Sequence, residues 1–428
     1  MTNALFTRAR LPQPRQGRHS VAQGVSPGSG GGPHPAFGTP LPPGGRGDGG
    51  EGAVCRPTAC AVGYTLPPAP RAEFFAFCLL LAAFCFPVSA GADDLASAQA
   101  LLEAGHWKRA RALVEPRAAA NPNDARAAWL LSRIKLAFGD LEGALKLAQQ
   151  AVGLEDGNSD YHFQLGVVYG EMASRASIFA AGGLARKFKA EVEASLARDP
   201  KNLDALEALM EYSFQAPGLM GGDKTKAHAI ADQLVQLSPA RGYLAQAELA
   251  GEAKDQAEVE ESLRKAAGAD SRNYEAQTAL AGFLAQPARR NTEEAGRHAR
   301  EAVKLDPARA KGYSILAKVL ALERRWSELE AVLGTSEKNV WDDLTPYYEA
   351  ANALVESGVE LQRSETYARK YVGQEPEGEE PDRAHAHRLL GLILEKRGRK
   401  SEAVAELETA VRLNPRFKEA KDDLHRLK

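Results

Sequence analysis

The sequence has little cysteine, few aromatic residues and a single long apolar run. Its four cysteines, Cys55, Cys60, Cys78 and Cys85, all precede residue 86. The chain after residue 92 therefore offers no disulfide, no thiol nucleophile and no thiolate metal ligand. Aromatic residues make up 7% of the chain, and strand-like alternation and β-branched runs are scarce after residue 92. This scarcity disfavours a β-sheet fold.

The sequence also lacks a strong excess of one charge. Seven of its 54 basic residues and three of its 56 acidic residues lie within the first 92 positions, which leaves 47 basic and 53 acidic residues beyond them. A mildly acidic body, with a net charge of −6, is a poor binder of nucleic acid. We therefore expect no nucleic-acid partner.

The N-terminal part has a composition of its own. Residues 1–70 are rich in Pro, Gly, Ser and Arg without apolar periodicity, which predicts a disordered leader. Residues 71–92 combine a basic flank, a 13-residue apolar run from Phe74 to Phe86, and small residues at Ala90 and Ala92. That pattern is typical of a signal peptide. Its position some 70 residues into the chain suggests a start of translation assigned too far upstream, or else a genuine leader.

The signal-like segment predicts export to the periplasm or secretion, with cleavage after Ala90 or Ala92 and no membrane span in the mature chain. The alternative is an uncleaved anchor in the inner membrane. The apolar run is short for that purpose, because a spanning helix needs about 20 apolar residues.

The chain beyond residue 92 is repetitive. Gly105 is followed by Ala110 after five residues, and Gly139 and Ala144 repeat this pair 34 residues later. The same spacing returns near the end, at Gly398 and Ala403, and that segment closes with Leu-Asn-Pro415. Ala, Leu, Glu, Lys and Arg dominate, and the apolar residues have helical spacing.

A 34-residue period with these small residues resembles the tetratricopeptide repeat family. The resemblance covers residues 93–428 and implies an all-α, right-handed superhelical solenoid of about nine helical hairpins with a C-terminal capping helix from Phe417. An acidic linker, residues 374–382, lies within the array. The segment from Tyr169 to Ala245 further resembles a repeat variant of exported, uncharacterised bacterial tetratricopeptide proteins.

A glycine-rich stretch at residues 215–225 interrupts the fourth repeat. It contains Gly218, Gly221, Gly222, Asp223 and Lys224. A phosphate-binding loop would need Gly where Asp223 stands and a strand before it. A wide turn, in which Asp223 caps the next helix, is favoured. A partner-contacting or ligand-contacting loop stays open as an alternative.

The concave face supplies the other candidate site. The family resemblance places the face-lining residues on the first helix of each hairpin, and the candidates for partner binding are Arg126, Trp129, Arg133, Phe163, Lys311, Lys318 and Arg388. Trp129 and Phe163 with flanking Arg suit an extended peptide with apolar and acidic side chains. Burial of both aromatics between repeats is the competing interpretation.

No motif for catalysis, a cofactor or a metal is visible. The seven histidines after residue 92 include no pair at the i, i+4 spacing of a helical zinc site. We therefore expect no enzyme, no cofactor and no metal, and predict a scaffold or adaptor of the bacterial envelope that binds a protein or peptide. Two alternatives are an assembly factor for envelope export or pilus machinery, and a small-ligand or glycan binder using the 215–225 loop.

Overall fold

The computed structural model describes residues 90–289, 291–378 and 381–428, leaving aside the side chains of residues 90–93 and 178. The predicted leader, residues 1–70, and nearly all of the predicted signal peptide, residues 71–92, lie outside the described residues. All described residues belong to one compact unit of the chain. They form 19 α-helices and one short 3-10 helix, and no strand occurs among them. Within these ranges no helix is both long and apolar enough to cross a membrane.

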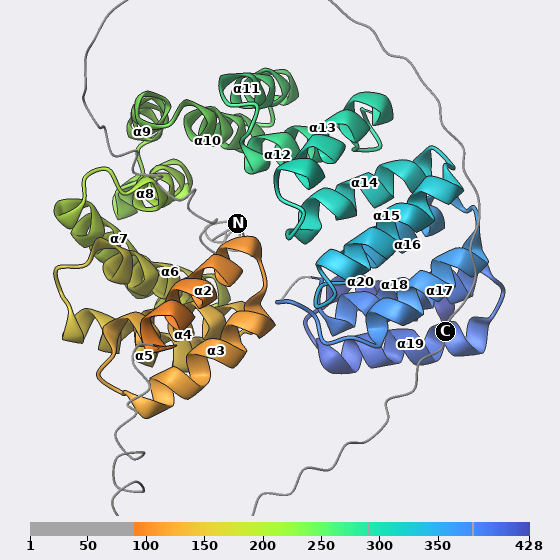
Figure 1. Cartoon of the computed structure of the whole chain (residues 1–428), viewed down its shortest axis with the longest axis horizontal. Coiled ribbons are helices and arrows are strands. Elements are labelled where there is room, and N and C mark those ends of the chain that lie inside the picture. Colours follow the sequence, from red (N-terminus) through yellow and green to blue (C-terminus); the bar gives the residue numbers. More distant parts are fainter. Residues whose placement is uncertain (1–89, 290, 379–380) are drawn as a thin grey trace, which may run out of the picture. The chain divides into compact units, whose positions relative to one another are not determined.

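The helices pair into nine antiparallel hairpins across the described ranges, followed by one more helix, and consecutive helices lie side by side in chain order (Figure 1). The hairpins are α2 (Ala90–Ala104) with α3 (Trp107–Ala120), α4 (Ala125–Ala137) with α5 (Leu141–Leu154), α6 (Ser159–Arg175) with α7 (Ile178–Arg198), α8 (Leu203–Gln215) with α9 (Lys224–Leu237), α10 (Pro239–Glu252) with α11 (Gln256–Ala269), α12 (Tyr274–Leu284) with α13 (Thr292–Leu305), α14 (Ala310–Leu322) with α15 (Trp326–Asn339), α16 (Thr345–Ser357) with α17 (Leu361–Val372), and α18 (Arg383–Lys396) with α19 (Lys400–Leu413). The last helix is α20 (Lys418–Leu427). The expected solenoid of nine hairpins with a capping helix is thus confirmed.

Local sequence explains where the helices begin and turn. The side chains of Asp124 and Asn202 cap α4 and α8 by accepting hydrogen bonds from backbone N–H groups of the first turn. Gly139 and Gly398, between the two helices of their hairpins, have φ of 77° and 76°. A residue with a side chain would be strained in this left-handed conformation, so the repeated glycine fixes the reversal of the chain.

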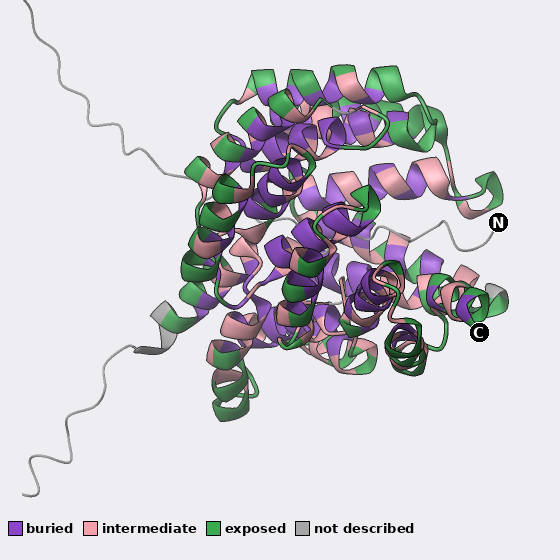
Figure 2. Cartoon of the chain, turned by 90° about the vertical axis from the view of Figure 1, so that its right-hand side faces the viewer, coloured by how far each residue is buried: buried purple, intermediate pink, exposed green. Residues whose placement is uncertain are grey.

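The core consists of small residues at helix crossings with larger apolar residues around them. Ala144 and Ala403 have no exposed surface. A Cβ atom on Gly391 of α18 would lie 2.9 Å from Cγ of Leu407 in α19, so these helices approach too closely for a side chain there. Buried residues line the facing sides of neighbouring helices, and exposed residues lie on the outer sides (Figure 2). The repeat spacing therefore encodes close helix packing.

The third and fourth hairpins depart from the regular pattern. The overlong third repeat lengthens its helices, because α6 has 17 residues and α7 has 21. In the fourth, the 3-10 helix η2 (Gly218–Met220) precedes Gly221, whose φ of 86° turns the chain toward α9. The fifth repeat, the weakest match in the sequence, still forms a complete hairpin from α10 and α11.

Candidate binding pocket and the contacts beside it

A pocket of about 560 Å³ lies among the first helices of the sixth, seventh and eighth hairpins, against the first hairpin. We call it the Lys318 pocket. Residues from α12, α14, α16, the end of α17, the α2–α3 turn and the α17–α18 linker contribute to its wall: Ala104, Gly105, Trp107, Thr278, Ala279, Gly282, Ala285, Arg309, Ala310, Lys311, Ser314, Ile315, Lys318, Asp343, Thr345, Glu349, Tyr371 and Glu377.

Helical periodicity explains why α14 dominates this wall. Four residues of α14 in this wall are spaced three, one and three positions apart: Lys311, Ser314, Ile315 and Lys318. Residues three, four and seven apart share one helix face, so all four side chains face the same side of α14. Gly282 of α12 stands opposite, where an added Cβ would lie 3.8 Å from Cδ1 of Ile315.

The wall of the Lys318 pocket contains both basic and acidic side chains. Lys318 Nζ lies 4.0 Å from a carboxylate oxygen of Glu349, at the outer limit of an ion pair, and 26% of the Lys318 side chain is exposed. Burial raises the pKa of Glu349, although the nearby Lys318 opposes this. Burial likewise raises the pKa of Asp343 and raises that of Glu377 to about 7. Among the contacts of the described residues, Lys318 pairs with Glu349, and only at the outer limit of an ion pair.

Lys311 and Lys318 are thus the two predicted residues that the structure brings together in one pocket. Lys311 Nζ lies 3.4 Å from Glu275 Oε2, and Arg309 shares that carboxylate. Burial works against ionisation of Glu275, but Lys311 and Arg309 outweigh it and lower its pKa. Glu275 is therefore held as a carboxylate at the edge of the pocket.

The aromatic candidates lie elsewhere, inside the core. Trp129 is 9% exposed and packs with Tyr161, their ring centroids 5.7 Å apart. Phe163 is 7% exposed and belongs to a different apolar cluster. Because each ring packs between repeats, the two do not form the shared exposed patch that their spacing suggested. Their role in partner binding stays a prediction.

The three arginines among the candidates have local contacts. Arg126 donates a hydrogen bond to Gln99 Oε1 at 2.9 Å. Arg133 is 4% exposed, and its guanidinium carbon lies 5.2 Å from the centre of the Trp129 ring. Arg388 pairs with Asp423 of α20 at 2.8 Å. None of the three lines the Lys318 pocket. The ion pair of Arg388 with Asp423 joins α18 to the capping helix α20.

The 215–225 loop has the geometry of a wide turn. Asp223 Oδ1 accepts a hydrogen bond from the backbone N–H of Lys226 at 3.0 Å and so caps α9. A Cβ on Gly222 would lie 1.7 Å from the Ala216 carbonyl oxygen, so only glycine fits there. The Lys224 ammonium lies 4.7 Å from the Phe214 ring centre. Gly218 and Gly221 bound the 3-10 turn. Asp223, Gly222 and Gly221 thus shape the turn, and a contact of the loop with a partner or ligand stays a prediction.

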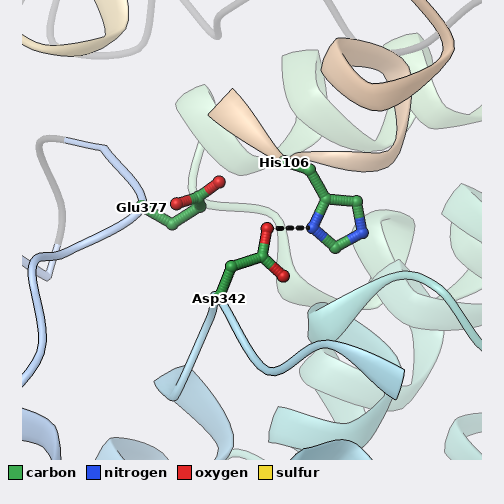
Figure 3. Close-up of side chains that lie close together, drawn as sticks. All are labelled: His106, Asp342 and Glu377. Carbon is green, nitrogen blue, oxygen red and sulfur yellow. Dashed lines mark hydrogen bonds and ion pairs between the residues drawn. The ribbon is translucent and has the colours of Figure 1, made fainter. Parts of the chain in front are cut away.

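A polar cluster beside the pocket joins segments that are far apart in sequence (Figure 3). We call it the His106 cluster: His106, Lys108, Asp342 and Glu377. His106 Nδ1 lies 2.8 Å from Asp342 Oδ2, and its Nε2 lies 2.6 Å from the carbonyl oxygen of Ala308. His106 and Asp342 are 2% and 1% exposed. The cluster fastens the α2–α3 turn to loops of the seventh and eighth hairpins.

Lys108 extends the same contact to the α17–α18 linker. Its Nζ donates hydrogen bonds of 2.6 Å to the carbonyl oxygens of Asp342 and Glu375, and lies 3.1 Å from Glu377 Oε2. Its backbone N–H donates to Glu377 Oε1 at 3.0 Å. The predicted acidic linker therefore contacts the first hairpin through Glu375 and Glu377.

The pKa values of the cluster reflect this pairing. Burial acts to lower the pKa of His106, but its hydrogen bond with Asp342 and the charge of that carboxylate outweigh burial and raise it. Burial acts to raise the pKa of Asp342, and the same contact with His106 lowers it instead. Each group thus favours the charged form of the other.

The cluster also has the donor atoms of a metal site. One ligand atom each from His106, Asp342 and Glu377 lie within 4.8 Å of one another. The sequence predicted no metal because local spacing reveals only ligands that are close in the chain, whereas His106 and Asp342 are 236 positions apart. Only the return of the array to its first hairpin brings them together.

Comparison with known proteins finds the tetratricopeptide repeat in two stretches of the chain. The tetratricopeptide repeat family model matches residues 95–160 and 348–416, near the two ends of the hairpin series. None of the curated proteins matches the sequence. The solved structures that it resembles include TTC0263, a thermophilic tetratricopeptide protein of Thermus thermophilus, at 20% identity and a TM-score of 0.40, over 46% of this chain and 100% of that one.

Two further solved structures extend over more of the chain. Yeast Tom70 is 14% identical with a TM-score of 0.42, over 79% of this chain and 88% of that one. A tetratricopeptide repeat protein from Parabacteroides merdae is 14% identical with a TM-score of 0.39, over 72% of this chain and 99% of that one.

Proposed function

We propose that this chain, a member of the tetratricopeptide repeat family, is a non-catalytic scaffold of the bacterial envelope that binds an acidic segment of a partner protein in the Lys318 pocket. Arrays of this kind present concave surfaces to their partners. The observation that carries the proposal is a pocket on the first helices of three hairpins with an incompletely neutralised Lys318 in its wall.

The size and lining of the pocket suit a peptide segment. A volume of about 560 Å³ falls within the range of about 300–1,000 Å³ for small-ligand sites. Trp107, Ile315 and Tyr371 provide apolar wall, while Ser314 and Thr345 provide hydroxyl groups. A carboxylate beside Lys318 would replace the distant contact with Glu349 by a direct charge-assisted hydrogen bond, which is stronger than a contact between neutral groups.

Charge reversal at Lys318 tests this directly. Fluorescence anisotropy would compare labelled peptides rich in Asp and Glu with matched peptides carrying Asn and Gln. We expect the acidic peptides to bind the full chain, and Lys318→Glu to weaken that binding at least tenfold, because attraction becomes repulsion. Lys318→Arg should retain it. Lys304→Glu is the matched control, since its side chain on α13 is 78% exposed and outside the pocket. Equal binding by Lys318→Glu and Lys304→Glu would refute the proposed site.

Location in the envelope is a separate part of the proposal. It is supported by the signal-like sequence of residues 71–92. Mass spectrometry of envelope fractions should find a mature N-terminus at Gly91 or Asp93. A mature chain that retains Phe74 would instead support the uncleaved inner-membrane anchor.

The partner distinguishes an adaptor from an assembly factor. A photo-crosslinking residue placed at Ser314, inside the pocket, would capture the bound segment in cells. Capture of one soluble protein with an acidic segment would support the role of an adaptor. Capture of several subunits of an export or pilus machine, in fixed proportion, would support the role of an assembly factor. The glycan-binding alternative at the 215–225 loop has less support, because Asp223 and Gly222 serve the turn.

A further inference from the structure

We propose that the His106 cluster binds one divalent transition-metal ion of the Zn²⁺ class, through His106 Nδ1 and the carboxylates of Asp342 and Glu377. The ion would join the α2–α3 turn, the α15–α16 loop and the α17–α18 linker. Glu377 also belongs to the wall of the Lys318 pocket, but the metal site does not depend on the peptide binding proposed there.

The three side chains lie close enough to share an ion after they rearrange. Their ligand atoms lie within 4.8 Å of one another and come from three segments that converge (Figure 3). In the tetrahedral geometry of Zn²⁺, two ligands at about 2.1 Å from the ion are about 3.4 Å apart. The widest pair must therefore approach by more than about 1 Å, while His106 Nδ1 and Asp342 Oδ2, now 2.8 Å apart, must separate slightly. Glu377 belongs to the linker between α17 and α18, so its movement requires no displacement of a helix.

A buried oxygen without a hydrogen bond provides a second, independent observation. Asp342 Oδ1 is buried and has no hydrogen-bond partner, and the Asp342 side chain is 1% exposed. The nearest cation, Arg109, lies 4.0 Å from this oxygen, at the outer limit of an ion pair. A buried carboxylate oxygen without a hydrogen bond is costly. A bound cation would satisfy it, whereas Glu377 Oε2 already lies 3.1 Å from the Lys108 ammonium.

The orientation of the imidazole also suits a ligand. His106 Nε2 lies 2.6 Å from the carbonyl oxygen of Ala308, so an Nε2–H group donates to that carbonyl and Nδ1 faces the carboxylates. Metal-binding histidines commonly have their second ring nitrogen fixed by such a backbone acceptor. Binding exchanges the proton on Nδ1 for the ion, and that proton passes to solvent.

The ligand atoms select the class of ion. With neutral His106, the carboxylates of Asp342 and Glu377 balance the charges of Lys108 and of Arg109, which lies 4.0 Å from Asp342 Oδ1. Lys108 stays in place, since Asp342 and Glu375 each accept a hydrogen bond from it through their carbonyl oxygens. An imidazole nitrogen with two carboxylates suits Zn²⁺ and its first-row neighbours. Mg²⁺ and Ca²⁺ prefer oxygen ligands alone.

The test uses the full chain, stripped with EDTA and dialysed. Isothermal titration with ZnCl₂ in two buffers of different ionisation enthalpy should show one ion bound per chain, with release of a proton and a rise in melting temperature. MgCl₂ and CaCl₂ should give neither effect. His106→Gln, Asp342→Asn and Glu377→Gln should each weaken Zn²⁺ binding at least tenfold. His298→Gln is the control, because that ring contacts Gln277 and Glu294 away from the cluster.

Two results would overturn the proposal. The first is a wild-type chain that binds no Zn²⁺. The second is Zn²⁺ binding that is unchanged in His106→Gln, which would mean an adventitious ion only, held by surface pairs such as His387 with Glu406. Circular dichroism of each variant without metal shows whether weaker Zn²⁺ binding results from loss of folding. Glu377→Gln is useful here because Glu377 lies outside the helices, so its substitution does not interrupt one. Peptide binding at Lys318 is measured separately, so either proposal can fail alone.

Discussion

The interior of the last hairpin and the His106 cluster are stabilised by different interactions, apolar packing in the first and polar contacts in the second. At the closest approach of α18 and α19, Gly391, Ala403 and Leu407 meet through apolar contact. In the His106 cluster, charged side chains and backbone carbonyls meet through hydrogen bonds. The first contact joins residues about a dozen positions apart, and the second joins residues 236 positions apart.

This difference separates two kinds of stability. Apolar packing depends on shape, so it tolerates changes of pH and salt and fails when volume is added. A polar contact between distant loops depends on charge state and geometry, and it contributes less to the free energy of unfolding. In a repeat array each hairpin mainly contacts its neighbours, so damage to either contact should remain partly local. Three substitutions test that contrast, starting with the largest expected effect.

Overpacking the hairpin interior should have the strongest effect. Ala403 has no exposed surface, so Ala403→Leu inserts a large side chain between α18 and α19 and should cost about 1–3 kcal/mol. Thermal unfolding followed by circular dichroism measures the loss. Ser401→Leu is the control on an exposed position of the same helix. Equal melting temperatures for the two variants would mean that the assigned repeat register is wrong.

Breaking the His106 cluster should have a smaller and more local effect. Asp342→Ala removes the acceptor of His106, and a net hydrogen bond contributes about 1 kcal/mol. In EDTA, hydrogen–deuterium exchange should accelerate in α2, α3 and residues 374–378, and remain unchanged in α18 and α19. Trp341→Ala is the control in the same loop, since that side chain is 60% exposed. Faster exchange throughout the array would contradict a local role for the cluster.

The smallest effect concerns pH at the capping helix. The hydrogen bond from Arg426 lowers the pKa of Glu395, and its Nη2 lies 2.9 Å from Glu395 Oε2. Because the pKa of Glu395 is lower in the folded chain than in the unfolded chain, where it is near 4.5, the ionised carboxylate stabilises the fold at pH values above 4.5. This contribution is lost as the pH falls through the pKa of the folded chain. Glu395→Gln should therefore lower the melting temperature slightly near pH 7 and have no effect near pH 3.

This pH effect also needs a control, because the pair is exposed and salt screens such contacts. Asp422→Asn, on an exposed position of α20, should leave the melting temperature unchanged at both pH values. A Glu395→Gln effect that persists at acid pH, or that is insensitive to salt, would point to lost packing and exclude a charge effect.

Much of the fold could be predicted from local sequence. The spacing of Gly105, Gly139 and Gly398 predicted the turns, and all three have positive φ. The alanines at the helix crossings predicted the close packing, and Ala144 and Ala403 are fully buried. Such features succeed because a turn or a helix pair is built from residues close together in the chain.

The candidate site was only partly predictable. Lys311 and Lys318 were identified because the family resemblance places them at groove-lining positions of the first helix of a repeat, and the structure brings both to one pocket. Trp129 and Phe163 were identified in the same way, yet each is buried in a different cluster. A helix pattern shows which residues share a face. It does not show whether that face is exposed or packed against another segment.

The sequence by itself determined the repeat and the small residues that pack each hairpin, because these depend on contacts within about 34 residues. Only the tertiary structure decided that His106 meets Asp342 and that Glu377 reaches Lys108. That meeting depends on small rotations accumulated over successive hairpins. No local spacing records their sum, so the polar cluster and the pocket wall beside it emerge only when the whole array is built.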